Sequence, residues 1–175
     1  MRAVRFDGTS VTLQRQWRDP VPGPGEALVR PVLTGVCSSD TEIARGGTTF
    51  TGTLGHEFVG VVEDVNIPAG APSHLQEKKS LKGRRVVGSI NIVCGKCDMC
   101  KRGLSPHCRS RTVLGIAGRD GVFADRFTIP AASAGPCDRS MTIERNPLLR
   151  KSCKRPNAAT MRCMPPKCLR RPGFG

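Results

Sequence analysis

The chain of 175 residues lacks three features that would quickly assign it to a class of protein. No apolar run approaches the length of a membrane-spanning helix. Near the N-terminus, Arg2, Arg5 and Asp7 interrupt the apolar residues before the hydrophobic region of an export signal could form. No stretch reads G-x-G-x-x-G, so the usual cradle for the phosphates of a dinucleotide is absent. These absences predict a cytoplasmic protein without membrane spans, whose nine cysteines bind metal or stay reduced.

Acidic residues are also scarce, since the chain has 14 aspartates and glutamates but 28 lysines and arginines. The imbalance is uneven: residues 132–175 hold ten basic and two acidic residues, whereas residues 1–131 hold 18 and 12. The basic segment has one aromatic residue, Phe174, and no apolar periodicity, so it cannot bury enough surface to offset its chain entropy. We therefore predict a folded domain over residues 1–131 and a disordered basic tail over residues 132–175.

Four cysteines fall within fifteen residues, in the stretch VCGKCDMCKRGLSPHC, at gaps of two, two and seven. Two-residue gaps let a tight turn direct successive sulfurs onto one ion, and Gly95 and Gly103 supply the backbone freedom for such turns. Four thiolates fill a tetrahedral coordination sphere, so the ion would be structural. The spacing predicts a structural zinc site in a lobe at about residues 93–110, formed by Cys94, Cys97, Cys100 and Cys108.

Other interpretations of these four thiols remain open. An iron–sulfur cluster also uses four thiolates, and spacing alone does not distinguish it from zinc. A disulfide pair does not suit a reducing compartment, and a redox Cys-x-x-Cys would need a βαβ unit that nothing near Val93 indicates. His107 is an alternative fourth ligand in place of Cys108.

Short strands separated by frequent turns predict a mainly β fold, a barrel or a sandwich. Asp7-Gly8 is a hairpin signal, and Ser38 or Ser39 is a candidate cap for a short helix through Thr41 to Arg45. A polar stretch over residues 66–82 predicts a surface loop, in which His74 is given no function. The expected strands cover residues 1–6, 11–13, 27–33, 58–65, 85–92 and 122–129.

A second set of potential ligands lies outside the lobe. Cys37 ends a predicted strand, and His56 and Glu57 precede another, so a thiolate and an imidazole provide half of a catalytic zinc site. Each motif alone is weak, because a lone cysteine or histidine usually has a structural role. The combination with the cysteine lobe resembles the zinc-containing medium-chain alcohol dehydrogenase family. The stretches that carry the resemblance are GEALVRPVLTGVCSSD, TLGHEFVGVV, GRRVV, CGKCDMCKRG with Cys108, and GRDGVFADRFTIP.

This resemblance implies a GroES-like, partly open β-barrel over residues 1–131, with a structural-zinc lobe. It also implies a catalytic zinc at Cys37 and His56 that acts as a Lewis acid toward an alcohol, with hydride passing to or from NAD(P). Ser39 matches the family's proton-relay hydroxyl and Asp40 a carboxylate that orients a zinc ligand. Glu57 matches a carboxylate that binds the zinc or stands just outside it. Ser39 and Asp40 also suit a helix start, which is the simpler structural interpretation.

After Pro130 the family pattern stops, so the Rossmann domain that binds the dinucleotide and the usual third catalytic ligand are missing, unless Glu57 serves. The tail's cysteines have irregular gaps and predict no second structural zinc site. A tail rich in arginine, proline and cysteine favours the hypothesis of a frameshift, a misplaced splice or a truncated gene model. These tail cysteines are Cys137, Cys153, Cys163 and Cys168.

Two classes of function follow from the sequence. The first is a zinc-dependent alcohol or polyol dehydrogenase whose catalytic domain is present and which turns over its alcohol or aldehyde substrate poorly alone. The alternative is a zinc-stabilised, non-catalytic binding module with a polyanion-binding tail, or a partial subunit that associates with full-length relatives and modulates them. No recognition helix or aromatic platform accompanies the basic residues, so nucleic acid is not an expected partner, whereas a homo-oligomer or an association with full-length relatives is.

Overall fold

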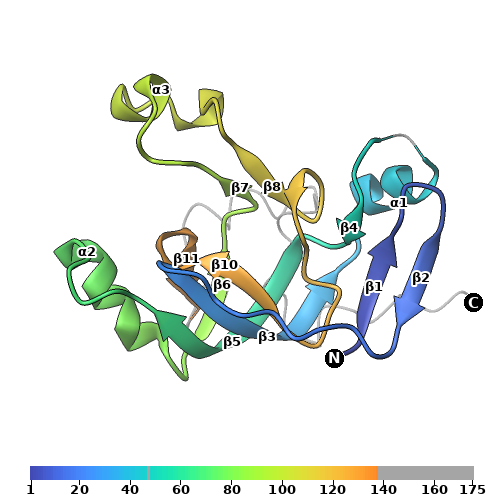
Figure 1. Ribbon diagram of the computed structural model, residues 1–175, viewed down its shortest axis with the longest axis horizontal. Helices are drawn as coiled ribbons and strands as arrows, with labels where there is room; N and C mark the ends of the chain where they lie inside the picture. Colours follow the sequence, from blue (N-terminus) through green and yellow to red (C-terminus); the bar gives the residue numbers. More distant parts are fainter. Residues whose placement is uncertain (47, 138–175) are drawn as a thin grey trace, which may run out of the picture. The chain divides into compact units, whose positions relative to one another are not determined.

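A five-stranded antiparallel sheet is the largest element of the chain in the computed structural model, which describes residues 1–46 and 48–137 (Figure 1). Its strand order is β10-β3-β5-β6-β11. The two central strands are ten residues long and pair along their whole length. The strands are β3 (Glu26–Gly35), β5 (Glu57–Asn66), β6 (Arg85–Gly88), β10 (Phe127–Pro130) and β11 (Ala134–Pro136).

The main hydrophobic core lies on one face of this sheet. Along β5, Phe58, Gly60 and Val62 are buried in alternation with more exposed residues, as expected for a strand with one face against a core. The rings of Phe58 and Phe127 meet edge to face with centroids 4.8 Å apart. The largest fully buried members of this core are Val29, Val62, Val86, Leu114, Val122 and Ile129.

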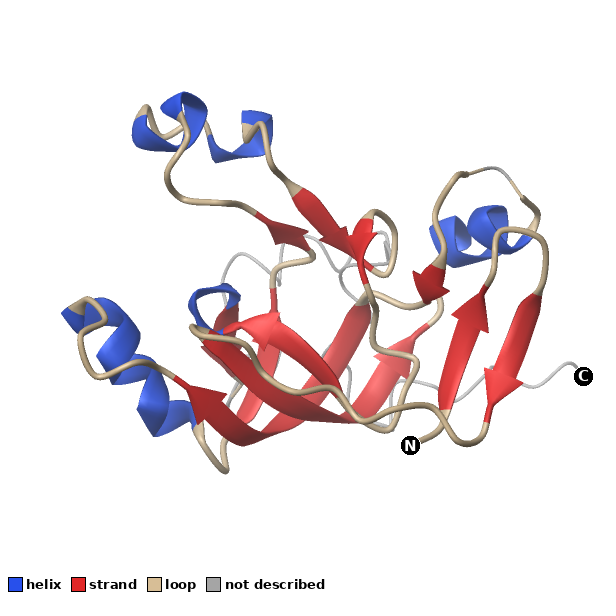
Figure 2. Ribbon diagram, in the orientation of Figure 1, coloured by secondary structure: helices blue, strands red, loops and turns tan. Residues whose placement is uncertain are grey.

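Two three-stranded sheets complete the β structure, one ordered β2-β1-β4 and the other β7-β8-β9 (Figure 2). The predicted Asp7-Gly8 hairpin is present, with Gly8 at φ +104° between β1 and β2. The sheets do not close on one another, and the mainly β, GroES-like fold class predicted from the sequence is confirmed. The remaining strands are β1 (Ala3–Phe6), β2 (Val11–Gln14), β4 (Gly52–Thr53), β7 (Asn91–Ile92), β8 (Thr112–Leu114) and β9 (Gly118–Arg119).

Two predicted strands are shorter than expected. The span 85–92 is broken at Ser89, whose backbone N–H bonds to the Ser133 carbonyl, so β6 and β7 belong to different sheets. In the span 122–129 only β10 is a strand of the main sheet. The preceding residues instead bond to the loop around Leu54 and Gly55, because the backbone N–H groups of Val122 and Phe123 donate to those two carbonyls.

The prediction of a loop over residues 66–82 was also wrong in part. It contains helix α2 (Ser73–Gln76) and the 3₁₀ helix η1 (Glu77–Leu81), which buries Leu81 in the core, while His74 is exposed as expected. Helix α1 (Ser38–Ala44) begins after Cys37, so Cys37 is its N-cap rather than Ser38 or Ser39.

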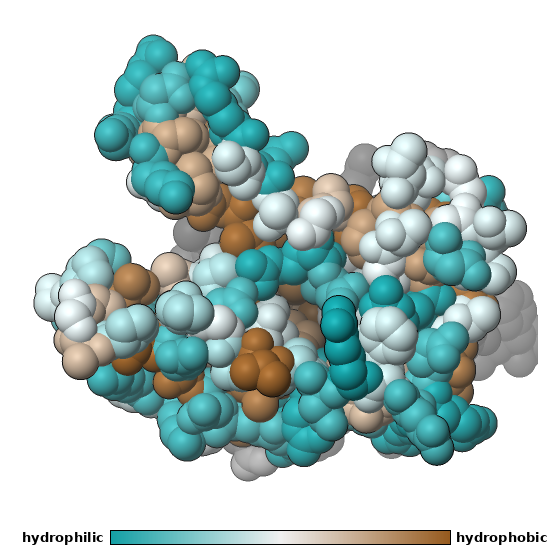
Figure 3. All heavy atoms as spheres, in the orientation of Figure 1, coloured by the Kyte–Doolittle hydropathy of each residue, from teal (hydrophilic) through white to brown (hydrophobic). Residues whose placement is uncertain are grey.

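The cysteine lobe is an excursion between β7 and β8 with two short helical turns, α3 (Asp98–Lys101) and η2 (Ser105–His107) (Figures 1 and 2). Figure 3 shows hydrophilic side chains over most of its visible surface. None of the helices in the described ranges is long and apolar enough to span a membrane.

The described fold continues past Ala131, through the 3₁₀ helix η3 (Ala131–Ser133) into β11. The first compact unit runs from Met1 to Pro136. The predicted disorder of the tail and its cysteines Cys153, Cys163 and Cys168 lie outside the described residues.

Candidate functional site

Three potential metal ligands from different parts of the chain meet where β3 ends and β5 begins. Cys37 follows β3 at the start of α1, and His56 and Glu57 stand at the first residues of β5. The register of the two strands places Gly35 opposite Glu57, which brings the two chain segments together. One ligand atom from each of Cys37, His56 and Glu57 lies within 4.8 Å of the others.

Gly35 leaves room for the Glu57 side chain at this site. A Cβ atom at position 35 would lie 2.5 Å from Glu57 Oε2 and 3.3 Å from its Cβ, closer than side-chain atoms approach one another. The carboxylate therefore lies over the backbone of β3, in reach of Cys37 and His56. The sequence alone did not single out Gly35.

Asp40 connects the two residues that carry the thiol and the imidazole. Its Oδ2 accepts a 2.9 Å hydrogen bond from the backbone N–H of Cys37, and its Oδ1 lies 3.4 Å from Nδ1 of His56. The Asp40 and His56 side chains are each 4% exposed, and these two facing atoms have no well-aligned hydrogen bond. Because Nδ1 faces Asp40, Nε2 is the imidazole atom left to face Cys37 and the rest of the cluster.

Ser39 stands on the Nε2 side of the imidazole, with its Oγ 3.4 Å from that nitrogen. A hydroxyl in this position can exchange a proton with a group bound beside the histidine. The structure therefore brings together all five residues that the sequence placed at the catalytic zinc site, namely Cys37, Ser39, Asp40, His56 and Glu57.

The four cysteines of the lobe form a second cluster. Cys94, Cys97, Cys100 and Cys108 each offer a sulfur within 4.8 Å of the other three. Cys108 is buried whereas His107 is exposed, so the thiol rather than the imidazole faces the cluster. The four thiols are free; the Sγ atoms of Cys94 and Cys108, for example, lie 3.6 Å apart, well beyond the length of a disulfide bond.

Local backbone geometry builds this second cluster as the spacing predicts. The turns after the first and third cysteines are made by Gly95 at φ +70° and Gly103 at φ +74°, a region that favours glycine. Asp98 accepts two hydrogen bonds from Arg109, at 2.7 and 2.9 Å, which ties the first half of the lobe to the second.

Comparison with known proteins places this geometry in a family. The alcohol dehydrogenase GroES-like domain matches residues 23–139, about two thirds of the chain. The chain belongs to this family. Its resemblance to zinc-containing alcohol dehydrogenases, read first from sequence motifs, is thereby confirmed.

Individual relatives are about three times as long as the region they share with this chain. L-threonine 3-dehydrogenase of Streptomyces avermitilis is 36% identical over 122 residues, which cover 66% of this chain and 33% of the relative. The starvation-sensing protein RspB of Escherichia coli is 35% identical over 118 residues, covering 66% and 32%. The chain thus spans about a third of the length of these curated relatives.

Solved structures agree with these relatives. A zinc-binding dehydrogenase from Sinorhizobium meliloti, bound to NADP, superimposes with a TM-score of 0.64 at 32% identity, covering 78% of this chain and 38% of that one. A structure of Escherichia coli RspB complexed with NADH has a TM-score of 0.67 at 28% identity, covering 81% and 40%.

The electrostatics of this GroES-like domain favour a reactive thiol at the first site. Hydrogen bonds from the side chain and backbone of Ser39, together with one from His56, lower the pKa of Cys37 to about 7. Burial alone raises the pKa of Asp40, but the contacts with His56 and the Cys37 backbone outweigh it, so the pKa is lowered. Asp40 in turn raises the pKa of His56. The site therefore holds an ionised carboxylate and a thiol that ionises readily, as metal ligation requires.

In the cysteine lobe, the local environment shifts the pKa values of two neighbouring thiols in opposite directions. Backbone N–H groups of Cys100 and Arg109 lower the pKa of Cys97 to about 6. Desolvation and the neighbouring Cys97 raise the pKa of Cys100 to about 12. Four sulfurs this close cannot all ionise without a cation between them.

The loop that carries His56 is held by contacts that the sequence did not reveal. The backbone N–H of Gly121 donates to the Thr53 carbonyl at 2.7 Å, and that of Val122 donates to the Gly55 carbonyl at 3.0 Å. A Cβ atom at Gly115 or Gly121 would overlap the Gly55 carbonyl oxygen. Gly55 therefore packs directly against Gly115 and Gly121, which are distant from it in the sequence. The glycines of LGIAGRDG are the only sequence signal for this contact.

Proposed function

We propose that this chain carries the alcohol-activating zinc site and the structural-zinc lobe of an NAD(P)-linked alcohol dehydrogenase. The observation that carries the proposal is the cluster of Cys37, His56 and Glu57, with Asp40 behind the imidazole. Sulfur, nitrogen and carboxylate oxygen are all ligands that zinc accepts, and three protein ligands leave one position for a substrate.

Two observations, in addition to the types of ligand, indicate that the residues of the site can bind zinc. The buried His56 Nδ1 faces a carboxylate that would fix its tautomer, so Nε2 is free to bind a cation. The thiol of Cys37 ionises near neutral pH because of its hydrogen bonds, and a thiolate is the form that binds metal. Zinc bound here would supply Lewis acidity toward an alcohol oxygen.

The chain's own residues have separate tasks in this proposal. Cys37 and His56 bind the cation, and Glu57 completes the set or stands beside it. Asp40 keeps the imidazole oriented through Nδ1 and holds the backbone of Cys37. Ser39 lies on the Nε2 side of the ring, where its hydroxyl can accept a proton from the alcohol and pass it toward solvent.

In the cysteine lobe, four sulfur ligands would leave no open coordination position, so the metal there would stabilise the conformation of the lobe. Its four sulfurs would enclose one zinc ion, and the excursion between β7 and β8 is too polar to fold without it. Zinc in place of an iron–sulfur cluster is favoured because related dehydrogenases are described as zinc-binding.

Hydride transfer requires a nicotinamide that this chain has no motif to hold. The sequence lacks G-x-G-x-x-G, and related structures that contain NADP or NADH are more than twice as long as the part that this chain covers. We therefore expect the isolated chain to bind zinc and to oxidise alcohols very slowly, because catalysis needs a positioned nicotinamide.

Elemental analysis of the purified chain tests the metal assignment. We expect two zinc ions per chain in the wild type, one in Cys37→Ser with His56→Ala, and one in Cys97→Ser with Cys100→Ser. Iron and sulfide in the preparation would identify a cluster in the lobe instead. A wild-type content of one zinc, unchanged by Cys37→Ser with His56→Ala, would refute the proposed catalytic site while leaving the lobe intact.

A further inference from the structure

Phe123 lies against the residue that precedes the proposed zinc ligand His56. A Cβ atom at Gly55 would lie 2.4 Å from Cδ1 of the Phe123 ring and 2.6 Å from Cε1 and Cγ, so one edge of the ring packs on the Gly55 backbone. Gly55 is buried and has φ +90°, a region that favours glycine. Because His56 follows directly, the ring limits where the backbone of this ligand can lie.

Backbone hydrogen bonds join Phe123 to the same loop and to β1. The Phe123 N–H donates to the Leu54 carbonyl at 2.9 Å, the Leu54 N–H donates to the Val4 carbonyl at 3.1 Å, and the Val4 N–H donates to the Phe123 carbonyl at 2.8 Å. The three bonds form a closed ring between three segments that are far apart in the sequence. The backbone of Phe123 is therefore fixed to the loop that carries His56, and its side chain has a defined position on that loop.

The Phe123 side chain also contacts the packing behind the second ligand. It packs against a small apolar cluster that includes Ile43, a buried residue of helix α1. Cys37 is the N-cap of this helix, and Asp40 lies in its first turn. Phe123 packs against the main core as well. One side chain therefore adjoins both the packing of the helix capped by Cys37 and the loop that ends at His56.

We propose that Phe123 is a positioning residue for the first metal site, and that its ring fixes the separation of Cys37 and His56. The inference rests on the proposed zinc site and adds to it a residue without a ligand atom. Cys37 and His56 are nineteen positions apart, so their separation depends on packing between segments. Asp40 acts on the imidazole itself, whereas Phe123 acts on the backbone that carries it. Close-packed interiors yield little, which lets a supporting ring hold two ligands in register.

The contact depends on the shape of the ring and not only on its apolar character. The atoms that lie against Gly55 are Cγ, Cδ1 and Cε1, which form one edge of the ring. Tyrosine keeps this edge, and because Phe123 is only partly buried, the added hydroxyl need not enter a closed core. Leucine has no atom at the Cε1 position, and methionine replaces the flat edge with a flexible chain. Tyrosine should therefore preserve the position of the loop, whereas leucine and methionine should not.

Competition between the full 175-residue chain and a chromophoric chelator measures the zinc affinity of each site. We expect Phe123→Leu to weaken the first site by about tenfold or more, as for other residues that support metal ligands, and to leave the affinity of the lobe unchanged. Phe123→Tyr should bind zinc at both sites as the wild type does. Phe123→Met should weaken the first site in the same way as Phe123→Leu, and it serves if that variant does not fold.

Leu81→Ala is the matched control, because Leu81 is buried in the main core but does not belong to the cluster that contains Ile43. It should lower the urea midpoint of unfolding without changing zinc affinity at the first site. Wild-type affinity in Phe123→Leu and Phe123→Met would overturn the inference, and so would an equal loss in Phe123→Tyr or in Leu81→Ala. A wild-type chain that binds zinc only in the lobe would instead refute the proposed function, and this inference with it.

Discussion

The carboxylate of Asp40 stands between Cys37 and His56, with Oδ2 2.9 Å from the backbone nitrogen of Cys37 and Oδ1 3.4 Å from the imidazole Nδ1. Two ligand-bearing residues, nineteen positions apart in the sequence, are thus oriented by one buried side chain. Asp40 does not belong to the ligand cluster itself, so its contribution is to the position and basicity of the ligands.

Replacing Asp40 with asparagine should weaken zinc binding at the first site by about 10–100-fold, because the imidazole loses its charged partner. Competition with a chromophoric chelator measures the affinity of each site. The affinity of the lobe for zinc should be unchanged. Asp64→Asn, at an exposed residue paired with Lys82, is the control and should leave both affinities unchanged. Wild-type affinity in Asp40→Asn would contradict the orienting role.

Gly35→Ala should displace the Glu57 carboxylate, since the added Cβ would lie 2.5 Å from Oε2. If Glu57 is the third ligand, Gly35→Ala and Glu57→Gln should lower zinc affinity at the first site to a similar extent. Gly70→Ala is the control, because a Cβ there meets no atom within 4 Å. Unchanged affinity in both variants would place Glu57 outside the coordination sphere.

If the lobe binds zinc as proposed, removal of the metal should unfold residues 93–110 locally, because bonds to four thiolates would be the main contacts that hold this polar excursion together. Hydrogen exchange of Cys97→Ser should show faster exchange in the lobe and unchanged protection in β3 and β5. Cys137→Ser, at a cysteine outside both ligand clusters, is the matched control. Equal protection of the lobe with and without metal would contradict a zinc-dependent fold.

Gly121→Ala should destabilise the domain by about 1–3 kcal/mol, the usual cost of overpacking. Its Cβ would overlap the carbonyls of Leu54 and Gly55, which precede His56. Urea unfolding measures the change, and zinc affinity at the first site should fall with it. Gly135→Ala, where a Cβ meets nothing within 4 Å, should change stability far less.

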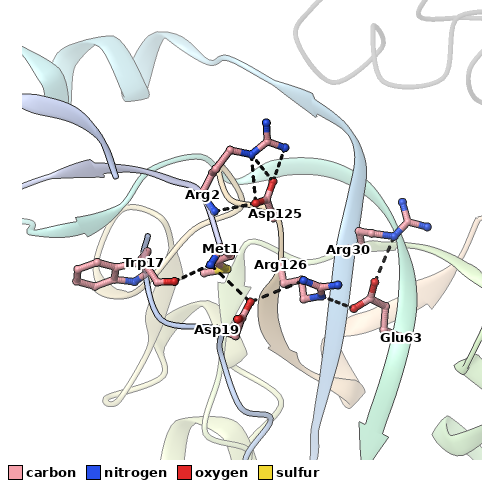
Figure 4. A network of polar contacts seen from close by, with 8 residues as sticks. All are labelled: Met1, Arg2, Trp17, Asp19, Arg30, Glu63, Asp125 and Arg126. Carbon is pink, nitrogen blue, oxygen red and sulfur yellow. Dashed lines mark hydrogen bonds and ion pairs between the residues drawn. The ribbon is translucent and has the colours of Figure 1, made fainter. Parts of the chain in front are cut away.

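The stability contributed by Asp125 should depend on pH. Hydrogen bonds from the side chain and backbone of Arg2 lower the pKa of Asp125 (Figure 4). A carboxyl whose folded pKa is depressed stabilises the fold above its unfolded value of about 3.9 and loses that contribution as pH falls through the folded pKa. Asp125→Asn should therefore cost about 1 kcal/mol at pH 7 and progressively less below about pH 4. Urea unfolding of the wild type and of Asp125→Asn across this range measures the difference.

Much of the candidate site was predictable because its signals are local. The gaps between the four lobe cysteines and the glycines between them encode the turns that gather the sulfurs, and those turns are present with positive φ. The run FVGVV, rich in β-branched and aromatic residues, also favours a strand, and it forms the first half of β5. Cys37 and His56 could be paired only through resemblance to a family, since nothing local links them.

The sequence by itself determined the composition of the lobe cluster, the hairpin at Asp7-Gly8 and the mainly β class, because each depends on residue type and short spacing. Only the tertiary structure decided that Asp40 faces the imidazole, that Gly35 makes room for Glu57, and that Gly115 and Gly121 pack on Gly55. These contacts depend on the register between β3 and β5 and on the packing of distant loops. Strand register and loop packing are properties of the whole core, and no short stretch of sequence specifies them.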